Sequence, residues 1–145
     1  MDLQLGRDPR EVIEQLETTY ALSCQLEDAC WKGMSAKVMG LAYAVLGEQE
    51  AADSWWRIAA RASSRETDAY VWVRADVALA HAQYALEWGD AEVASENARA
   101  AIAVAARCGL EDILAGAAAV REALGEVGRG SGAGVEPDAV GALGR

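Results

Sequence analysis

The sequence predicts an all-α protein, and three observations lead to that prediction. Alanine is very frequent while phenylalanine is absent, and Ala loses no side-chain freedom when a helix forms. Only two prolines, Pro9 and Pro137, interrupt the 145 residues. Apolar residues recur at intervals of three and four over successive segments, which is the spacing of one face of a helix. We therefore expect about six helices in one domain.

The first expected helix runs from about residue 9 to residue 27. Asp8 can cap the free amide groups at its start, Pro9 suits the first helical position, and Glu11 stands three residues after the cap. The helix carries an apolar stripe that consists of Val12, Ile13, Leu16 and Tyr20. One face of this helix should therefore be buried. A first helix without its partner leaves this face free to recruit another chain, unless it covers the second helix fully.

The second and third expected helices form a hairpin. Asp28 can cap a helix that continues to Gly47, and glycine is the residue best able to adopt the left-handed conformation that ends a helix. The third helix spans about residues 49 to 64. Its stripe consists of Ala52, Trp55, Trp56, Ala59 and Ala62.

Three further helices follow. The fourth spans about residues 69 to 88, can be capped by Asp68, and carries on one side Trp72, Ala75, Leu79, Ala82 and Leu86. Gly89 repeats the turn of Gly47, and the fifth helix, about residues 91 to 107, ends at Gly109. The sixth spans about residues 111 to 124. We therefore expect a domain of residues 1–125, followed by a Gly-rich, flexible and disordered tail at 126–145, which has too few periodic apolar residues to offset the entropy of ordering.

One stretch places small and large residues where two antiparallel helices would have to touch. Its members are Ala36, Met39, Gly40, Tyr43, Gly47, Ala52, Trp56 and Ala59. This stretch resembles a tetratricopeptide (TPR) repeat, which folds two helices in about 34 residues. A weaker second copy lies 42 residues later, with Ala82 and Ala98 in the positions of Gly40 and Trp56. The resemblance implies a short TPR-like solenoid of about six antiparallel helices, in which each unit contacts its neighbours.

A longer pattern extends the resemblance over most of residues 10–125. It includes the run from Ala21 to Met34, the triplet Tyr70-Val71-Trp72 and the segment from Ala106 to Glu111. It looks like the C-terminal TPR region of bacterial LuxR/MalT-type ATPase transcriptional regulators. Neither a phosphate-binding loop motif nor a basic DNA-binding helix occurs in the sequence. The resemblance implies a sensing or docking portion of such a regulator.

The same resemblance implies where a partner would bind. In TPR domains the first helix of each repeat lines a concave groove, and the corresponding positions are the candidate groove residues. They are Met34, Lys37, Leu41, Ala44, Val45, Asp76, Leu79, Gln83, Leu86 and Glu87. A mixture of apolar residues and a few charges suits a peptide or a helix. The alternative is that the sixth helix or a second subunit fills this surface.

Composition and charge argue against other partners. The net charge is −10 and no stripe of Lys or Arg occurs, so nucleic acid is not expected to bind. No apolar segment approaches the ~20 residues that span a bilayer, and the N-terminus lacks a signal-peptide pattern. We therefore expect a cytoplasmic protein without membrane association. The acidic residues Glu11, Glu14 and Glu17 suggest a solvated face, or alternatively the steering of a basic partner.

The reactive residues do not form a catalytic or metal-binding pattern. His81 is the only histidine and has no Cys/His ligand spacing around it, which favours a structural role. The three cysteines favour reduced thiols, with a redox pair of Cys24 and Cys30 as the alternative to simple packing. Trp56 should fill the core, whereas any other tryptophan that is exposed becomes a binding candidate. These others are Trp31, Trp55, Trp72 and Trp88.

The leading hypothesis is a non-catalytic protein-interaction module without cofactor or metal, linked to transcriptional regulation. It would bind a protein segment, or a second copy of itself through the first helix. The competing hypothesis is a domain that senses a small-molecule effector. A pocket closed on several sides by Trp and Met would favour the sensor, whereas an open groove would favour the docking module.

Overall fold

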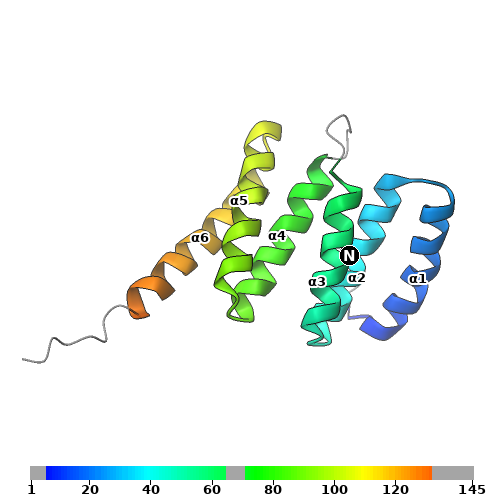
Figure 1. Cartoon of the computed structure of the whole chain (residues 1–145), viewed down its shortest axis with the longest axis horizontal. Coiled ribbons are helices and arrows are strands. Elements are labelled where there is room, and N and C mark those ends of the chain that lie inside the picture. The colour runs from blue at the N-terminus through cyan, green and yellow to red at the C-terminus, as the bar shows by residue number, and fades with distance from the viewer. Residues whose placement is uncertain (1–5, 65–70, 132–145) are drawn as a thin grey trace, which may run out of the picture.

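A computed structural model describes residues 6–64 and 71–131, and within these ranges the chain forms six α-helices and no strand. The helices are α1 (Pro9–Gln25), α2 (Ala29–Val45), α3 (Gln49–Ala62), α4 (Val71–Glu87), α5 (Ala91–Cys108) and α6 (Glu111–Ser131). The predicted all-α class is therefore confirmed. Figure 1 shows the helices side by side in chain order, as an elongated array from α1 to α6.

The helices are arranged in two layers. Each helix packs against the next along the chain, while α2 also contacts α4 and α4 also contacts α6. The even-numbered helices therefore lie beside one another, and the odd-numbered helices cover them from one side. Within this arrangement α2–α3 and α4–α5 are the two hairpins that the sequence repeat predicts.

Side-chain caps and left-handed residues determine where the helices begin and end. The Asp28 carboxylate accepts a hydrogen bond from the amide of Trp31 at 3.1 Å, as predicted for the start of α2. Gly47 and Gly89, which follow α2 and α4, both have φ of +78°, a conformation that glycine adopts without steric cost. The Asp68 cap predicted for α4 lies outside the described residues.

The turn between α1 and α2 has the same form although it contains no glycine. Glu27 occupies the left-handed position there, with φ of +54°. After each of the three turns a backbone amide bonds back to a carbonyl near the helix end: Asp28 to Ser23, Glu48 to Tyr43 and Asp90 to Ala85, at 3.0, 2.9 and 2.8 Å. The first turn is therefore strained relative to the other two, because a side chain in the left-handed region costs about 1–2 kcal/mol.

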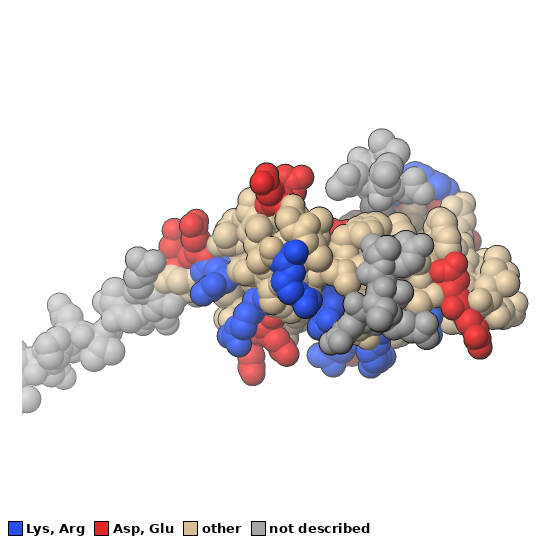
Figure 2. Space-filling model, turned by 90° about the horizontal axis from the view of Figure 1, so that it is seen from above, with Lys and Arg blue, Asp and Glu red and all other residues tan. Residues whose placement is uncertain are grey.

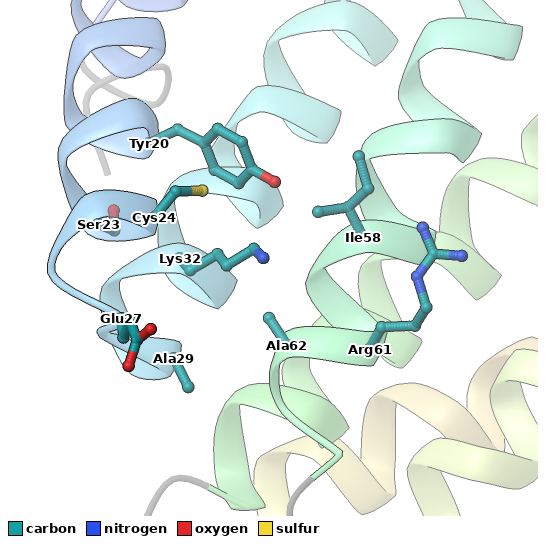
Figure 3. A pocket seen from close by; sticks show the side chains of 9 residues that line it. All are labelled: Tyr20, Ser23, Cys24, Glu27, Ala29, Lys32, Ile58, Arg61 and Ala62. Atoms are coloured by element: carbon teal, nitrogen blue, oxygen red, sulfur yellow. The ribbon is translucent and has the colours of Figure 1, made fainter.

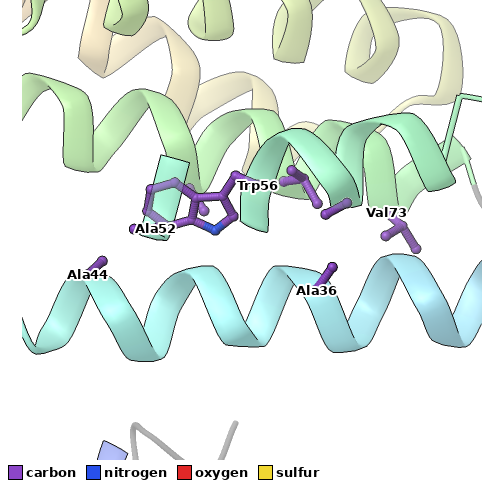
Figure 4. Packing of buried hydrophobic residues seen from close by; sticks show 8 residues of the cluster. Ala36, Ala44, Ala52, Trp56 and Val73 are labelled. Carbon is purple, nitrogen blue, oxygen red and sulfur yellow. The ribbon is translucent and has the colours of Figure 1, made fainter. Parts of the chain in front are cut away.

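Trp56 of α3 fills the centre of the larger core cluster, as predicted. Its side chain is fully buried, and a Cβ placed on Gly40 would lie 2.4 Å from its Nε1 atom. Figure 4 shows the indole between α3 and α2, with Ala36 and Ala44 of α2 directed toward α3. Glycine at position 40 is therefore what allows the two helices to cross at this distance.

The same tryptophan joins the first hairpin to the second. Its ring lies 5.1 Å from that of His81 and 5.5 Å from that of Tyr84, measured between centroids. His81 is buried, and its Nε2 atom lies 2.7 Å from Oδ1 of Asp53 on α3. A ring contact and a hydrogen bond thus hold α4 against α3.

Small residues bring α6 against the second hairpin. Ala82 and Ala98, which stand at the positions of Gly40 and Trp56, are both buried in a cluster with Val120 of α6. A Cβ on Gly116 would lie 3.0 Å from Cδ2 of Leu79. The backbone of α6 therefore approaches α4 closely at this point.

The predicted end of α6 was wrong. The helix continues to Ser131, beyond the expected end at residue 124 and beyond the expected domain boundary at 125. The prediction ended the helix at Leu124 because the Gly-rich segment that follows has too few periodic apolar residues to offset the entropy of ordering, but helical structure continues past Gly125. Residues 132–145 of the expected tail lie outside the described residues.

One predicted apolar face needs correction. Trp72, expected to face inward, is 41% exposed, while Val73 and Val77 are buried. The reason is that α4 contacts α2, α3, α5 and α6, so it has several buried faces and not one stripe.

On α1, Val12 and Ile13 are buried, and Ile13 lies in a cluster with Met39 and Ala42 of α2. Of the two predicted alternatives for this face, covering the second helix or recruiting another chain, the contacts with α2 favour the first.

Candidate functional site

The structure brings together two of the predicted groove residues from different helices. The ammonium group of Lys37 on α2 forms an ion pair with Oδ2 of Asp76 on α4. A lysine that clamps the carboxylate of a bound peptide must have its charge available. Lys37 is therefore a link between the helices, and a carboxylate clamp at this position is not supported.

Two of the ten predicted groove residues, both on α4, pack against α6. Leu79 lies in a cluster with Ala117 and Ile113 of α6, and Leu86 packs against the cluster that contains Val120. Ala44 is buried in the core. The alternative that the sixth helix fills this surface therefore holds for the α4 side. Gln83 and Glu87 remain exposed.

The α2 side of the surface stays open. Five apolar residues recur there at alternating intervals of three and four, and all are exposed or half-buried: Trp31, Met34, Val38, Leu41 and Val45. Trp31 is 58% exposed and Val45 is 54% exposed. We call these five residues the α2 stripe. Such spacing places them along one side of the helix, in the pattern by which helices pack in coiled coils.

The second hairpin shows what the α2 stripe lacks. The residues of α4 that stand 42 positions after Trp31 and Val38 are Val73 and Ala80. Both are buried in one cluster with Ala36 and Ala44 of α2. In α4 this face is thus covered by the preceding helix of the same layer, whereas in α2 Trp31 and Val45 stay exposed, and Met34 and Leu41 are partly buried against the core cluster.

Exposed acidic residues occur on α1 and α4, two of the helices that contact α2. Glu11 and Leu22 on α1 are eleven residues apart, which is about three helical turns, so they share one side of the helix. Leu22 and Leu26 are exposed. They stand two residues after Tyr20 and Cys24, respectively, which is about 200° around the helix, so the two leucines lie on the opposite side of α1 from Tyr20 and Cys24. On α4, Glu87 stands about three helical turns after Asp76, so the two acidic residues share one side of that helix. Figure 2 shows acidic and basic side chains interspersed on one face, without a continuous basic stripe.

Sequence reasoning identified three members of the stripe as groove residues and missed Val38. Met34, Leu41 and Val45 came from the resemblance, and Trp31 was a candidate in the event that it was exposed. The alternating spacing of three and four residues is the signal that could have found all five. It is hard to recognise in the sequence because α2 has apolar residues on every side. A helix that is apolar all round is normally buried all round.

A separate cavity of about 580 Å³ opens between α1, α2 and α3, on the other side of α1 from Leu22 and Leu26. Figure 3 shows its polar groups: the Tyr20 hydroxyl, the Cys24 thiol and the Lys32 ammonium group point into it, and Arg61 lies across from them on α3. Ile58 and Ala62 supply apolar surface. None of these residues was a predicted groove residue, although Cys24 was a candidate for a redox pair with Cys30. The cavity depends on three helices meeting, which no local pattern shows.

Tyr20 is held in a defined position within this cavity. Its ring meets that of Trp55 edge to face, with centroids 5.0 Å apart. Burial is the main reason that its pKa is raised, the hydrogen bond to Cys24 adds to this, and the charge of Arg61 opposes it. The Tyr20 hydroxyl therefore stays protonated at neutral pH and can donate a hydrogen bond.

The remaining reactive groups form no metal cluster within the described residues. In residues 6–64 and 71–131, no three His, Cys, Asp or Glu residues lie close enough to hold a metal ion. Cys24 and Cys108 are exposed, and no disulfide joins the cysteines of the described residues, so the redox pair stays a prediction. Burial lowers the pKa of His81, and the hydrogen bond to Asp53 opposes this only in part.

The fold and these surfaces define an all-α array of helical hairpins with one open apolar helix face and one cationic cavity. In comparisons with family models, with curated proteins and with solved structures, none matches this chain. Among the described helices, none is both long and apolar enough to cross a membrane.

Proposed function

We propose that this protein is a non-catalytic, TPR-like docking module that seats an amphipathic helix of a partner protein on the α2 stripe. The observation that carries the proposal is the apolar spacing of Trp31, Met34, Val38, Leu41 and Val45 on an open helix face. A helix-in-groove complex needs this spacing on both partners. The likeness to the TPR region of LuxR/MalT-type regulators supports the same class and a regulatory setting.

The second hairpin indicates the geometry of the complex. Because α2 covers Val73 and Ala80 of α4, a partner helix can cover Trp31 and Val38 of α2 in the same way. Exposed acidic residues on α1 and α4, Glu11 and Glu87 among them, favour basic residues on the partner. The net charge of −10 would speed association with such a partner.

The competing sensor function has less support. A pocket enclosed by Trp and Met side chains would favour a sensor. The cavity between α1, α2 and α3 is lined by neither Trp nor Met. The open α2 face is the feature that favours docking.

A synthetic helical peptide tests the proposal. The probe carries Leu at heptad positions a and d and Lys at e and g, and its binding is followed by fluorescence anisotropy. We expect the double variant W31K/V45K to weaken binding at least tenfold, which corresponds to about 1.4 kcal/mol. The matched control A115K/A118K adds the same charge on exposed positions of α6 and should bind like the wild type.

Equal loss in both variants would contradict the proposal, because it would reduce the effect to charge repulsion. Sedimentation of the chain alone supplies the other decisive result. A dimer that dissociates in W31K/V45K would assign the face to a second copy and overturn docking of a partner helix. Circular dichroism checks that both variants keep their helices.

A further inference from the structure

The cavity between α1, α2 and α3 has a composition that helix docking does not explain. It lies on the α3 side of α1, away from the exposed Leu22, and its volume of about 580 Å³ falls in the range of small-molecule sites, about 300–1,000 Å³. Its side chains come from three helices (Figure 3). It is therefore a separate candidate site.

Two cations line this cavity without a carboxylate partner. Lys32 comes from α2 and Arg61 from α3, and in the described part of the chain the ion pairs are Lys37–Asp76 and His81–Asp53. Lys37, five residues after Lys32 on the same helix, is neutralised by Asp76. Lys32 and Arg61 thus place two positive charges beside one cavity in a chain of net charge −10. Such a pair provides an electrostatic site for an anion.

Neutral groups complete the site. The Tyr20 hydroxyl stays protonated and is oriented by Trp55, so it can donate to an oxygen atom. The hydroxyl of Ser23 is not available, because it donates to the carbonyl of Thr19 at 2.6 Å. Ile58 offers an apolar wall. Glu27 lies at the edge of the cavity, in the turn between α1 and α2, and repels an anion that enters from that side (Figure 3).

We propose that this cavity binds a small organic oxyanion, a phosphate monoester or a carboxylate, with the oxygen atoms between the Lys32 ammonium group and the Arg61 guanidinium group. Arg presents a planar pair of donors that matches either group, and Tyr20 supplies a third donor. The organic part of the ligand lies against Ile58 and Ala62. This site does not depend on the docking of a helix to the α2 stripe.

Calorimetric titration at constant ionic strength with phenyl phosphate, benzoate and phenol tests the proposal. We expect saturable binding of an oxyanion, no binding of neutral phenol, and at least tenfold weaker binding in K32Q and in R61Q. R99Q, which removes an exposed cation of α5, should bind like the wild type. Binding of phenyl phosphate alone would identify a phosphate site, and binding of benzoate alone would identify a carboxylate site.

Labelling of cysteine locates the ligand. Alkylation of Cys24 in the cavity should slow at least threefold when the anion is bound, while alkylation of Cys108, exposed at the end of α5, should not change. Both rates are read from the same sample by mass spectrometry. Absence of saturable binding, equal weakening in R99Q, or equal protection of Cys108 would each overturn the proposal.

Discussion

The two joints along the array, α3 to α4 and α5 to α6, are built from opposite kinds of side chain. At the first joint Trp56 fills the space and contacts the rings of His81 and Tyr84. At the second joint the corresponding residue is Ala98, which packs against Val120 of α6. The same position of the repeat thus carries a large residue at the first joint and a small residue at the second.

The difference teaches that the size of this residue determines how the next helix is held. A tryptophan fixes α4 through one large, rigid contact, and it needs Gly40 on the other side to fit. An alanine lets α6 approach closely enough that Gly116 meets Leu79. Stability at the first joint should therefore depend on one residue, whereas at the second joint it is spread over many small contacts.

The largest expected effect comes from removing the large contact. Trp56→Ala should lower the free energy of unfolding by about 3–5 kcal/mol, because a fully buried aromatic side chain leaves a cavity. Ala98→Gly, at the corresponding position of the second joint, should cost only about 1 kcal/mol. Urea denaturation measures both. A similar cost for the two substitutions would contradict the comparison.

The next effect concerns the two close glycines. Gly40→Ala should cost about 1–3 kcal/mol, because the added Cβ would lie 2.4 Å from the Nε1 atom of an indole that cannot move away. Gly116→Ala is the matched control, since the group it meets is the end of a flexible leucine side chain. There the gain in helix propensity, about 1 kcal/mol, offsets the crowding. Thermal unfolding of the two variants compares them directly, and equal destabilisation would be the unexpected result.

A smaller, pH-dependent effect should arise at the first joint. Burial lowers the pKa of His81, so the folded protein resists protonation that the unfolded chain accepts below about pH 6.5. Stability should therefore fall as pH decreases through 6.5 toward the lower pKa of the folded state. The groups that face His81 are Asp53, Arg57 and Asp90.

The free energy of unfolding between pH 7.5 and 5.5 measures this effect. His81→Asn should remove most of the slope in that interval. A wild-type stability that stays constant or rises on acidification would show that Asp53 prevails over burial.

The smallest effect is expected where α2 meets α4 at the surface. The side chains of Lys37 and Asp76 are 22% and 32% exposed, and ion pairs that water reaches contribute about 0–1 kcal/mol. Lys37→Met should therefore change stability by less than about 1 kcal/mol, and added salt should reduce the difference further. A double-mutant cycle with Asp76→Asn isolates the pair, and a coupling of several kcal/mol would place it among the core contacts.

Local features of the fold were predictable from the sequence, and features that depend on the placement of distant helices were not. The caps at Asp8 and Asp28, the turn at Gly47 and the crossing of Gly40 with Trp56 each rest on residues close together in one hairpin. The all-α class followed from the same signals. These features are decided by steric fit and hydrogen bonding over a few residues.

The candidate site was predictable only in part. The groove positions on α2 were identified, but α6 covers Leu79 and Leu86 because of close packing at Gly116, far along the chain. The pairing of Lys37 with Asp76 depends on the register between two helices of different hairpins. The same is true of Lys32 and Arg61, which are separated by 29 positions.

The length of α6 has a consequence for how the protein opens. Leu124 of α6 packs against the cluster that contains Ala82 and Ala98, and Gly125, Gly128 and Gly130 follow within the helix. Each glycine weakens a helix, so protection of the backbone amides against hydrogen exchange should decrease from Val120 toward Ser131. The array therefore ends in a gradient of local stability, in which the last turns of α6 open and close many times before α5 is released.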